Sequence, residues 1–132
     1  MRHSRGSTRT AAQAAAVVVV AVLMSGCSSG DPAQAKEWQG LYCAKLGAWE
    51  KAKRASAASA AAAGDGEDTG YDIVASKGRA AIDASKRLDR EGLNHGGTKI
   101  LDDTVNAIGG DAGAEGRAAS YCDSAGFEAS AG

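Results

Sequence analysis

The chain has 132 residues, with 15 Lys and Arg against 16 Asp and Glu, so its formal net charge is −1. This length suits one small domain. A balanced charge gives no general basis for binding nucleic acid, which requires a strongly basic face, and we predict no nucleic-acid partner. Aromatic residues make up only 5% of the chain, so the core must depend largely on aliphatic side chains and alanine.

The first 26 residues have the pattern of an export signal. Arg2, Arg5 and Arg9 make the start of the chain basic, and an apolar run follows over residues 11–24. This run is too short to cross the hydrocarbon core, which takes about 20 residues. A basic start, a short apolar run and small residues at its end instead predict a signal peptide covering residues 1–26.

The end of the apolar run is Met24-Ser25-Gly26-Cys27, which resembles the lipobox of bacterial lipoproteins of the actinobacterial type. In that family leucine usually stands three places before the cysteine, whereas here Met24 stands there and Leu23 precedes it. The resemblance implies cleavage between Gly26 and Cys27 and attachment of diacylglycerol to the Cys27 thiol. Membrane lipid would then be one partner, and the chain would be anchored on the extracytoplasmic face of the cell membrane.

Two alternatives to lipid anchoring stay open. Ala33-Gln34-Ala35 has the small-x-small pattern of an ordinary signal cleavage site and would release a soluble protein. An uncleaved N-terminal anchor is the other alternative. If residues 1–26 are removed, three arginines are lost, Lys and Arg fall from 15 to 12 against 16 Asp and Glu, and the net charge becomes −4.

The remaining cysteines predict a disulfide. With Cys27 assigned to lipid, Cys43 and Cys122 form an even pair in an exported chain, where thiols oxidise by default. A Cys43–Cys122 bond would close a loop of about 80 residues, which corresponds to roughly 4 to 5 kcal/mol in the chain-entropy model. Such a covalent link suits a small domain with few large apolar side chains. Two free buried thiols are the alternative.

The spacing of apolar residues predicts an all-α fold of three or four short helices, because it repeats every three or four residues and nowhere alternates as in a strand. The expected helices cover about 33–58, 70–91, 98–108 and 111–125. They form a helical domain over 33–127, which follows a tether at 27–32 and precedes a loose tail at 128–132. The alanine-rich stretch at 55–63 can extend the first helix, but it offers little to pack, so we expect fraying there.

Local signals set the expected helix ends and inward faces. Asp31, Thr98 and Asp111 are the expected N-caps of the first, third and fourth helices, and glycines follow the last three helices as stop signals. The residues expected to point inward are Trp38, Tyr42, Leu46 and Trp49; Tyr71, Val74, Ala75, Gly78, Ala81, Ile82, Ser85 and Leu88; Ile100, Leu101, Val105 and Ile108; and Ala114, Ala118, Tyr121, Cys122 and Ala125. Phe127 is expected to pack back on the domain.

The residues that could carry chemistry form no reactive pattern. His95 has no second histidine or free cysteine at metal-ligand spacing and no serine elbow to serve, so we interpret it as an exposed turn residue. Residues 65–70 resemble the start of a calcium loop, but its twelfth position is Ser76 instead of the required glutamate. Asp102 and Asp103 are adjacent on a helix, so we expect both to be solvated. No catalytic residue, metal site or cofactor is predicted.

Together these features predict a non-catalytic, exported and membrane-anchored lipoprotein with a binding or structural role in the cell envelope. Its composition and layout resemble those of small alanine-rich lipoproteins, a resemblance that implies no site residues. The expected partner is an envelope protein or another surface component. Two other functions stay open: a prophage-type exclusion lipoprotein that blocks DNA entry, and a small-ligand carrier or enzyme with a cavity near Trp38, Trp49 or His95.

Overall fold

A computed structural model describes residues 30–63, 69–95 and 97–127, and this part of the chain consists of four α-helices without a strand. The helices are α1 (Pro32–Ala63), α2 (Thr69–Arg90), α3 (Ile100–Ile108) and α4 (Ala112–Ser124). The predicted all-α fold is therefore confirmed. Each helix lies within a few residues of its predicted position, except that α1 continues to Ala63.

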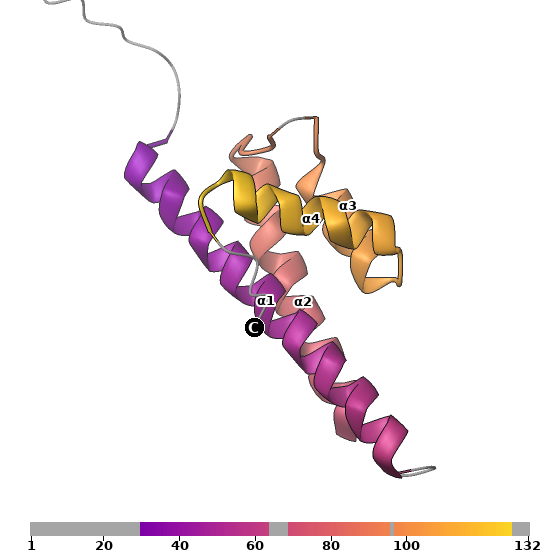
Figure 1. Ribbon diagram of the computed structural model, residues 1–132. Helices are drawn as coiled ribbons and strands as arrows, with labels where there is room; N and C mark the ends of the chain where they lie inside the picture. The colour runs from indigo at the N-terminus through magenta and orange to yellow at the C-terminus, as the bar shows by residue number, and fades with distance from the viewer. Residues whose placement is uncertain (1–29, 64–68, 96, 128–132) are drawn as a thin grey trace, which may run out of the picture.

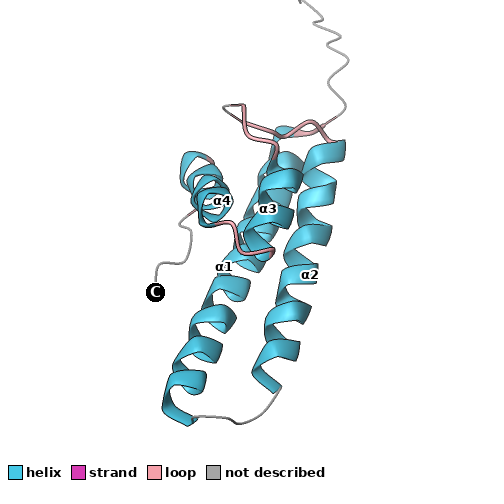
Figure 2. Cartoon of the chain, turned by 90° about the vertical axis from the view of Figure 1, so that its right-hand side faces the viewer, coloured by secondary structure: helices cyan, strands magenta, loops and turns pink. Residues whose placement is uncertain are grey.

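The two long helices form an antiparallel hairpin, and α3 and α4 pack on only one half of it (Figures 1 and 2). At 1.5 Å per residue, the 32 residues of α1 extend over about 48 Å. The far end of the hairpin, residues 55–63 and 69–73, projects beyond α3 and α4 and is called the arm below. Among the arm side chains that the structure describes, none is fully buried.

Aspartate side chains cap two helices as predicted. Asp31 Oδ1 accepts a hydrogen bond from the Ala33 N–H at 3.0 Å, and Asp111 Oδ1 accepts one from the Ala114 N–H at 2.9 Å. The bond from Ala114 holds the pKa of the Asp111 carboxyl below its usual value. An ionised carboxylate at this position also interacts favourably with the helix dipole.

The predicted cap of α3 is wrong. The helix begins at Ile100 instead of directly after Thr98, and the Ile100 N–H donates to Asn94 Oδ1 at 3.0 Å. The capping side chain thus comes from six residues earlier, because Asn94 lies beside the first turn of the helix. Capping rules consider the residues next to a helix and therefore miss a cap of this kind.

Glycines end α2 and α4 in the predicted manner. Gly92 and Gly126 have positive φ values of 67° and 82°, which glycine adopts without the penalty of a Cβ atom. This conformation turns the chain so that the Leu93 N–H bonds to Leu88 O and the Phe127 N–H bonds to Cys122 O, each at 2.9 Å. Phe127 then packs on the core as predicted.

The core lies where α3 and α4 meet the hairpin. Its large members come mainly from α1, where Tyr42, Leu46 and Trp49 are at most 2% exposed, and from Leu88 and Ile100. Small residues complete it: Ala81, Ala107, Ala114, Ala118 and the two cysteines. The structure thus confirms that Trp49 is part of the packing.

Two residues expected to point inward are exposed. Tyr71 is 72% exposed because it lies on the arm, beyond the reach of α3 and α4 and opposite the alanine-rich part of α1. Val105 is 45% exposed because Ile100, Thr104 and Ala107 occupy the inner face of α3. Hydrophobicity alone would have ranked Val105 above Thr104, so the burial of Thr104 requires a compensating interaction.

The stretch at 55–63 is helical throughout, where fraying was expected. Alanine has the highest intrinsic helix propensity of all residues, and the stretch continues a long helix that is already nucleated. Residues 57–62 are exposed, so burial does not account for their helical conformation.

Glycine at position 78 sets how closely α2 approaches its neighbours. A Cβ atom there would lie 3.2 Å from Ile108 Cγ2 and 3.4 Å from Trp49 Cδ1. We predict that Gly78→Leu lowers the free energy of unfolding by about 1 to 3 kcal/mol through overpacking. The control is Gly116→Ala on the exposed side of α4, where a Cβ meets nothing within 4 Å.

The control substitution should raise the free energy of unfolding by about 0.5 to 1 kcal/mol, because alanine is the better helix former. Urea titrations followed by circular dichroism measure both changes. Equal stability of Gly78→Leu and the parent protein would contradict the close packing of α2 against Ile108 and Trp49.

Candidate functional site

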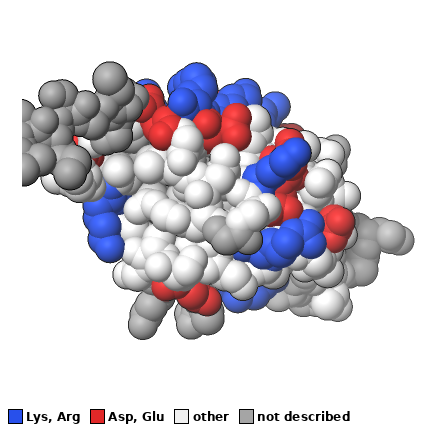
Figure 3. Space-filling view, turned by 90° about the horizontal axis from the view of Figure 1, so that it is seen from above, with Lys and Arg blue, Asp and Glu red and all other residues white. Residues whose placement is uncertain are grey.

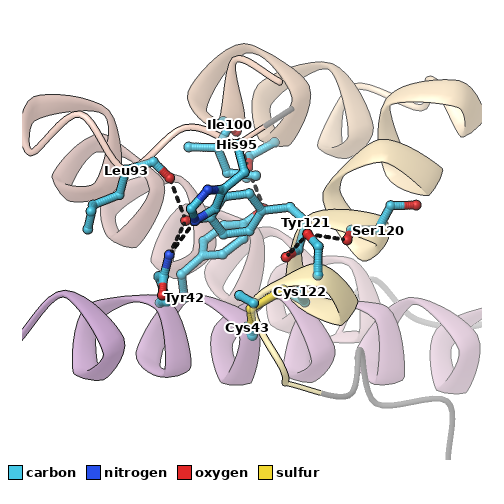
Figure 4. The surroundings of a disulfide bond; sticks show 12 residues. Tyr42, Cys43, Leu93, His95, Ile100, Ser120, Tyr121 and Cys122 are labelled. Carbon is cyan, nitrogen blue, oxygen red and sulfur yellow. Dashed lines mark hydrogen bonds between the residues drawn. A yellow bond between two sulfur atoms is a disulfide. The ribbon is translucent and has the colours of Figure 1, made fainter. Parts of the chain in front are cut away.

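The best-defined cluster in the molecule surrounds the predicted disulfide, which the structure confirms between Cys43 of α1 and Cys122 of α4 (Figure 4). Both cysteines are buried, at 3% and 0% exposure. The preceding residues, Tyr42 and Tyr121, meet edge to face with ring centroids 5.8 Å apart. The bond and the aromatic pair together fix α4 across the middle of α1.

The Tyr42 hydroxyl connects the cluster to α3. Thr104 Oγ1 lies 2.7 Å from the Tyr42 hydroxyl and 2.6 Å from the Ile100 carbonyl oxygen. Since the carbonyl can only accept, Thr104 donates to Ile100 and Tyr42 donates to Thr104. Burial raises the pKa of Tyr42 far above its ordinary value, which keeps this donor protonated. The two bonds satisfy Thr104 and explain its place on the inner face of α3.

The Tyr121 hydroxyl connects the cluster to the loop before α3. It donates to the Leu93 carbonyl oxygen at 2.8 Å and accepts from Gln39 Nε2 at 3.3 Å. The same Gln39 nitrogen lies 2.8 Å from His95 Nε2, which therefore acts as the acceptor. The His95 ring also lies against the Tyr121 ring, with centroids 5.3 Å apart (Figure 4). His95 is exposed, as predicted, but no pattern in the sequence indicated these partners.

Two ion pairs attach α4 to other helices. Arg117 Nε lies 2.8 Å from Asp103 Oδ1, and Lys53 pairs with Glu115 while its ammonium group lies over the Trp49 ring. The prediction that Asp103 is solvated is wrong, because it is only 7% exposed. Asp102, its neighbour, is exposed as expected.

A hollow lies beside this cluster, and backbone carbonyls engage one of the serine hydroxyls that line it. It has a volume of about 310 Å³ and is lined by His95, Thr98, Ser120, Tyr121 and Ser124. The Ser124 hydroxyl donates to the carbonyl oxygens of Ser120 and Tyr121, so it is not activated by the imidazole. Within the described ranges, no group of three or more His, Cys, Asp or Glu side chains could hold a metal ion.

Several predicted features lie outside the described residues. These are the signal peptide at 1–26 with its cleavage position between Gly26 and Cys27, the lipidation site Cys27, residues 27–29 of the tether, residues 65–68 of the calcium-like loop, and the tail at 128–132. None of the helices between residues 30 and 127 has both the length and the apolar content needed to span a bilayer.

The surface charge is mixed in sign. Figure 3, which looks down on the molecule from above, shows Lys and Arg side chains next to Asp and Glu side chains around a broad uncharged area. Comparisons with protein-family models, curated proteins and solved structures find no match to this chain. The function of the chain must therefore be inferred from the chemistry of its own residues.

The hydrogen bonds from Tyr42 to Thr104 and from Thr104 to Ile100 predict how the stability losses of three variants rank. Tyr42→Phe removes one donor and should lower the free energy of unfolding by about 0.5 to 1.5 kcal/mol. Thr104→Val should cost more, about 1 to 3 kcal/mol, because the buried Tyr42 hydroxyl then has no acceptor. In the double variant the costs should be less than additive, since no buried hydroxyl is left unpaired. Urea unfolding of the three variants measures this order, and full additivity would contradict the coupling.

The Cys43–Cys122 bond predicts that the unreduced protein has no thiol at either position. Under native conditions an alkylating reagent should leave residues 43 and 122 unlabelled, whereas unfolding plus reductant should expose two thiols to it. Peptide mass spectrometry distinguishes the two states. The Cys43→Ser/Cys122→Ser variant should lose about 4 to 5 kcal/mol of stability by loop-entropy arguments. Labelling of either residue in the unreduced protein would contradict a complete disulfide.

Proposed function

We propose that this chain is an exported, lipid-anchored and non-catalytic lipoprotein of the bacterial cell envelope, with a binding or structural role. The observation that carries the proposal is the position of Cys27, directly after a basic start, a short apolar run and the small residues Ser25 and Gly26. A thiol at this position can take diacylglycerol through a thioether. Each buried acyl CH₂ group adds about 0.8 kcal/mol of membrane affinity, so two or more chains hold a small domain firmly.

The disulfide between the other two cysteines supports export. Cys43 and Cys122 are paired and buried, and structural disulfides of this kind belong mainly to oxidising compartments outside the cytoplasm. Cys27 is the one cysteine of the sequence that the disulfide does not use. Each of the three cysteines thus has an assigned chemical role under the proposal.

The length of the tether supports anchoring of a folded domain near the membrane. Helix α1 begins at Pro32, five residues after Cys27. Fully extended, this segment spans at most about 17 Å. The N-terminal end of α1 would therefore lie close to the lipid headgroups, while the arm at its other end could extend toward a partner. The exposed Tyr71 and Ile73 of α2 belong to this arm and suit a binding role.

Metabolic labelling with a palmitate analogue tests the anchor. In the native host, the wild-type chain should incorporate label and fractionate with membranes, and Cys27→Ala should lose both properties because no acceptor thiol is left at that position. Cys43→Ser/Cys122→Ser is the matched control, since it removes two cysteines and leaves Cys27. Equal labelling of Cys27→Ala and wild type would overturn the proposal.

A further inference from the structure

Helix α3 presents apolar side chains on two faces, and only one of them is fully buried. Ile100 and Ala107 face the core, whereas Val105 is 45% exposed and Leu101 is half-buried beside the half-buried Ile82 of α2. These outer residues line a surface groove of about 550 Å³, called the α2–α3 groove below, whose remaining lining residues are Lys86, Asp102 and Asn106. An exposed apolar strip between polar side chains is typical of an interaction surface.

The charges along the groove make it complementary to itself. It holds one cation, Lys86, on the α2 side and one anion, Asp102, on the α3 side, so the two charges of the groove cancel. Lys86 forms a bond of 3.1 Å with Asp83 on the exposed face of α2, and its side chain is half exposed. Surface pairs of this kind contribute little, so Lys86 can exchange Asp83 for another carboxylate at small cost.

We propose that the α2–α3 groove is the interface of a two-fold dimer of this chain. In a two-fold interface the same patch meets its own copy, so a residue pair that makes one contact makes it twice. Around an axis that runs between Lys86 and Asp102, each Lys86 lies against the partner's Asp102. The flanking Leu101 and Val105 are then removed from water. A patch of a single charge sign would repel its copy, whereas this one attracts it.

The small number of apolar side chains sets the strength of the dimer. Three per copy bury less than the roughly 1,200 to 2,000 Å² of a stable interface, so association in free solution should be weak. Copies held in one membrane plane meet at a much higher effective concentration. This last step rests on the proposed function, whereas the pairing itself requires only the folded chain.

A charge exchange between two separate variants tests the pairing. Full-length chains are purified in detergent and labelled with donor or acceptor dyes, and association is measured by energy transfer as a function of concentration. Lys86→Glu alone and Asp102→Lys alone should each associate roughly tenfold more weakly than wild type, or worse, because both cross-pairs then bring like charges together. A mixture of the two variants should regain wild-type association, since every cross-pair is again between opposite charges.

The mixture separates contacts between copies from contacts within one copy, because an effect on folding alone cannot be repaired by a second chain. Val105→Glu should abolish association, whereas Ile73→Glu, at an aliphatic position of α2 that is 55% exposed and outside the groove, should leave it unchanged. Cys27→Ala in detergent should retain the charge-exchange pattern, so loss of anchoring and loss of pairing are distinguished. A monomeric wild type at every concentration, or a mixture no better than either variant alone, would overturn the dimer.

Discussion

The disulfide between Cys43 and Cys122 is the constraint on which the arrangement of the domain depends. Helix α4 contributes alanines and only one large buried side chain, Tyr121, so apolar burial alone holds it weakly. The bond fixes its position across α1 and removes much of the entropy of an unfolded chain whose linked residues are 79 apart. The ion pairs of Glu115 and Arg117 then define the orientation of α4 at its other end.

The two tyrosines beside the disulfide fill a core that has few large side chains, and their hydroxyl groups bond to neighbouring segments. Each buries a large ring, and each hydroxyl must find a partner because an unpaired buried polar group is costly. Tyr42 finds Thr104 on α3, and Tyr121 finds the Leu93 carbonyl in the loop before α3. The packing of α1 against α4 thereby also positions α3, to which neither cysteine belongs.

The sequence was sufficient for the features that depend on local chemistry or simple counting. The helices, the Asp31 and Asp111 caps, the glycine stops and the disulfide all follow from short-range rules or from an even pair of cysteines. Two of the errors concern partners far away in the chain. Thr104 occupies the inner face of α3 in place of Val105 because its hydroxyl bonds to that of Tyr42. Asp103 is buried because it pairs with Arg117.

The same distinction between local features and features that depend on distant residues applies to function. The anchor at Cys27 is a short linear pattern, so the sequence is enough to suggest it, whereas the α2–α3 groove requires two helices in a particular register. Because Ile100, Thr104 and Ala107 occupy the inner face of α3, Val105 is exposed and Leu101 is only half-buried beside Ile82. The polar contact between Tyr42 and Thr104 in the core therefore has a consequence at the surface. By selecting which face of α3 is buried, it leaves Val105 exposed at the surface.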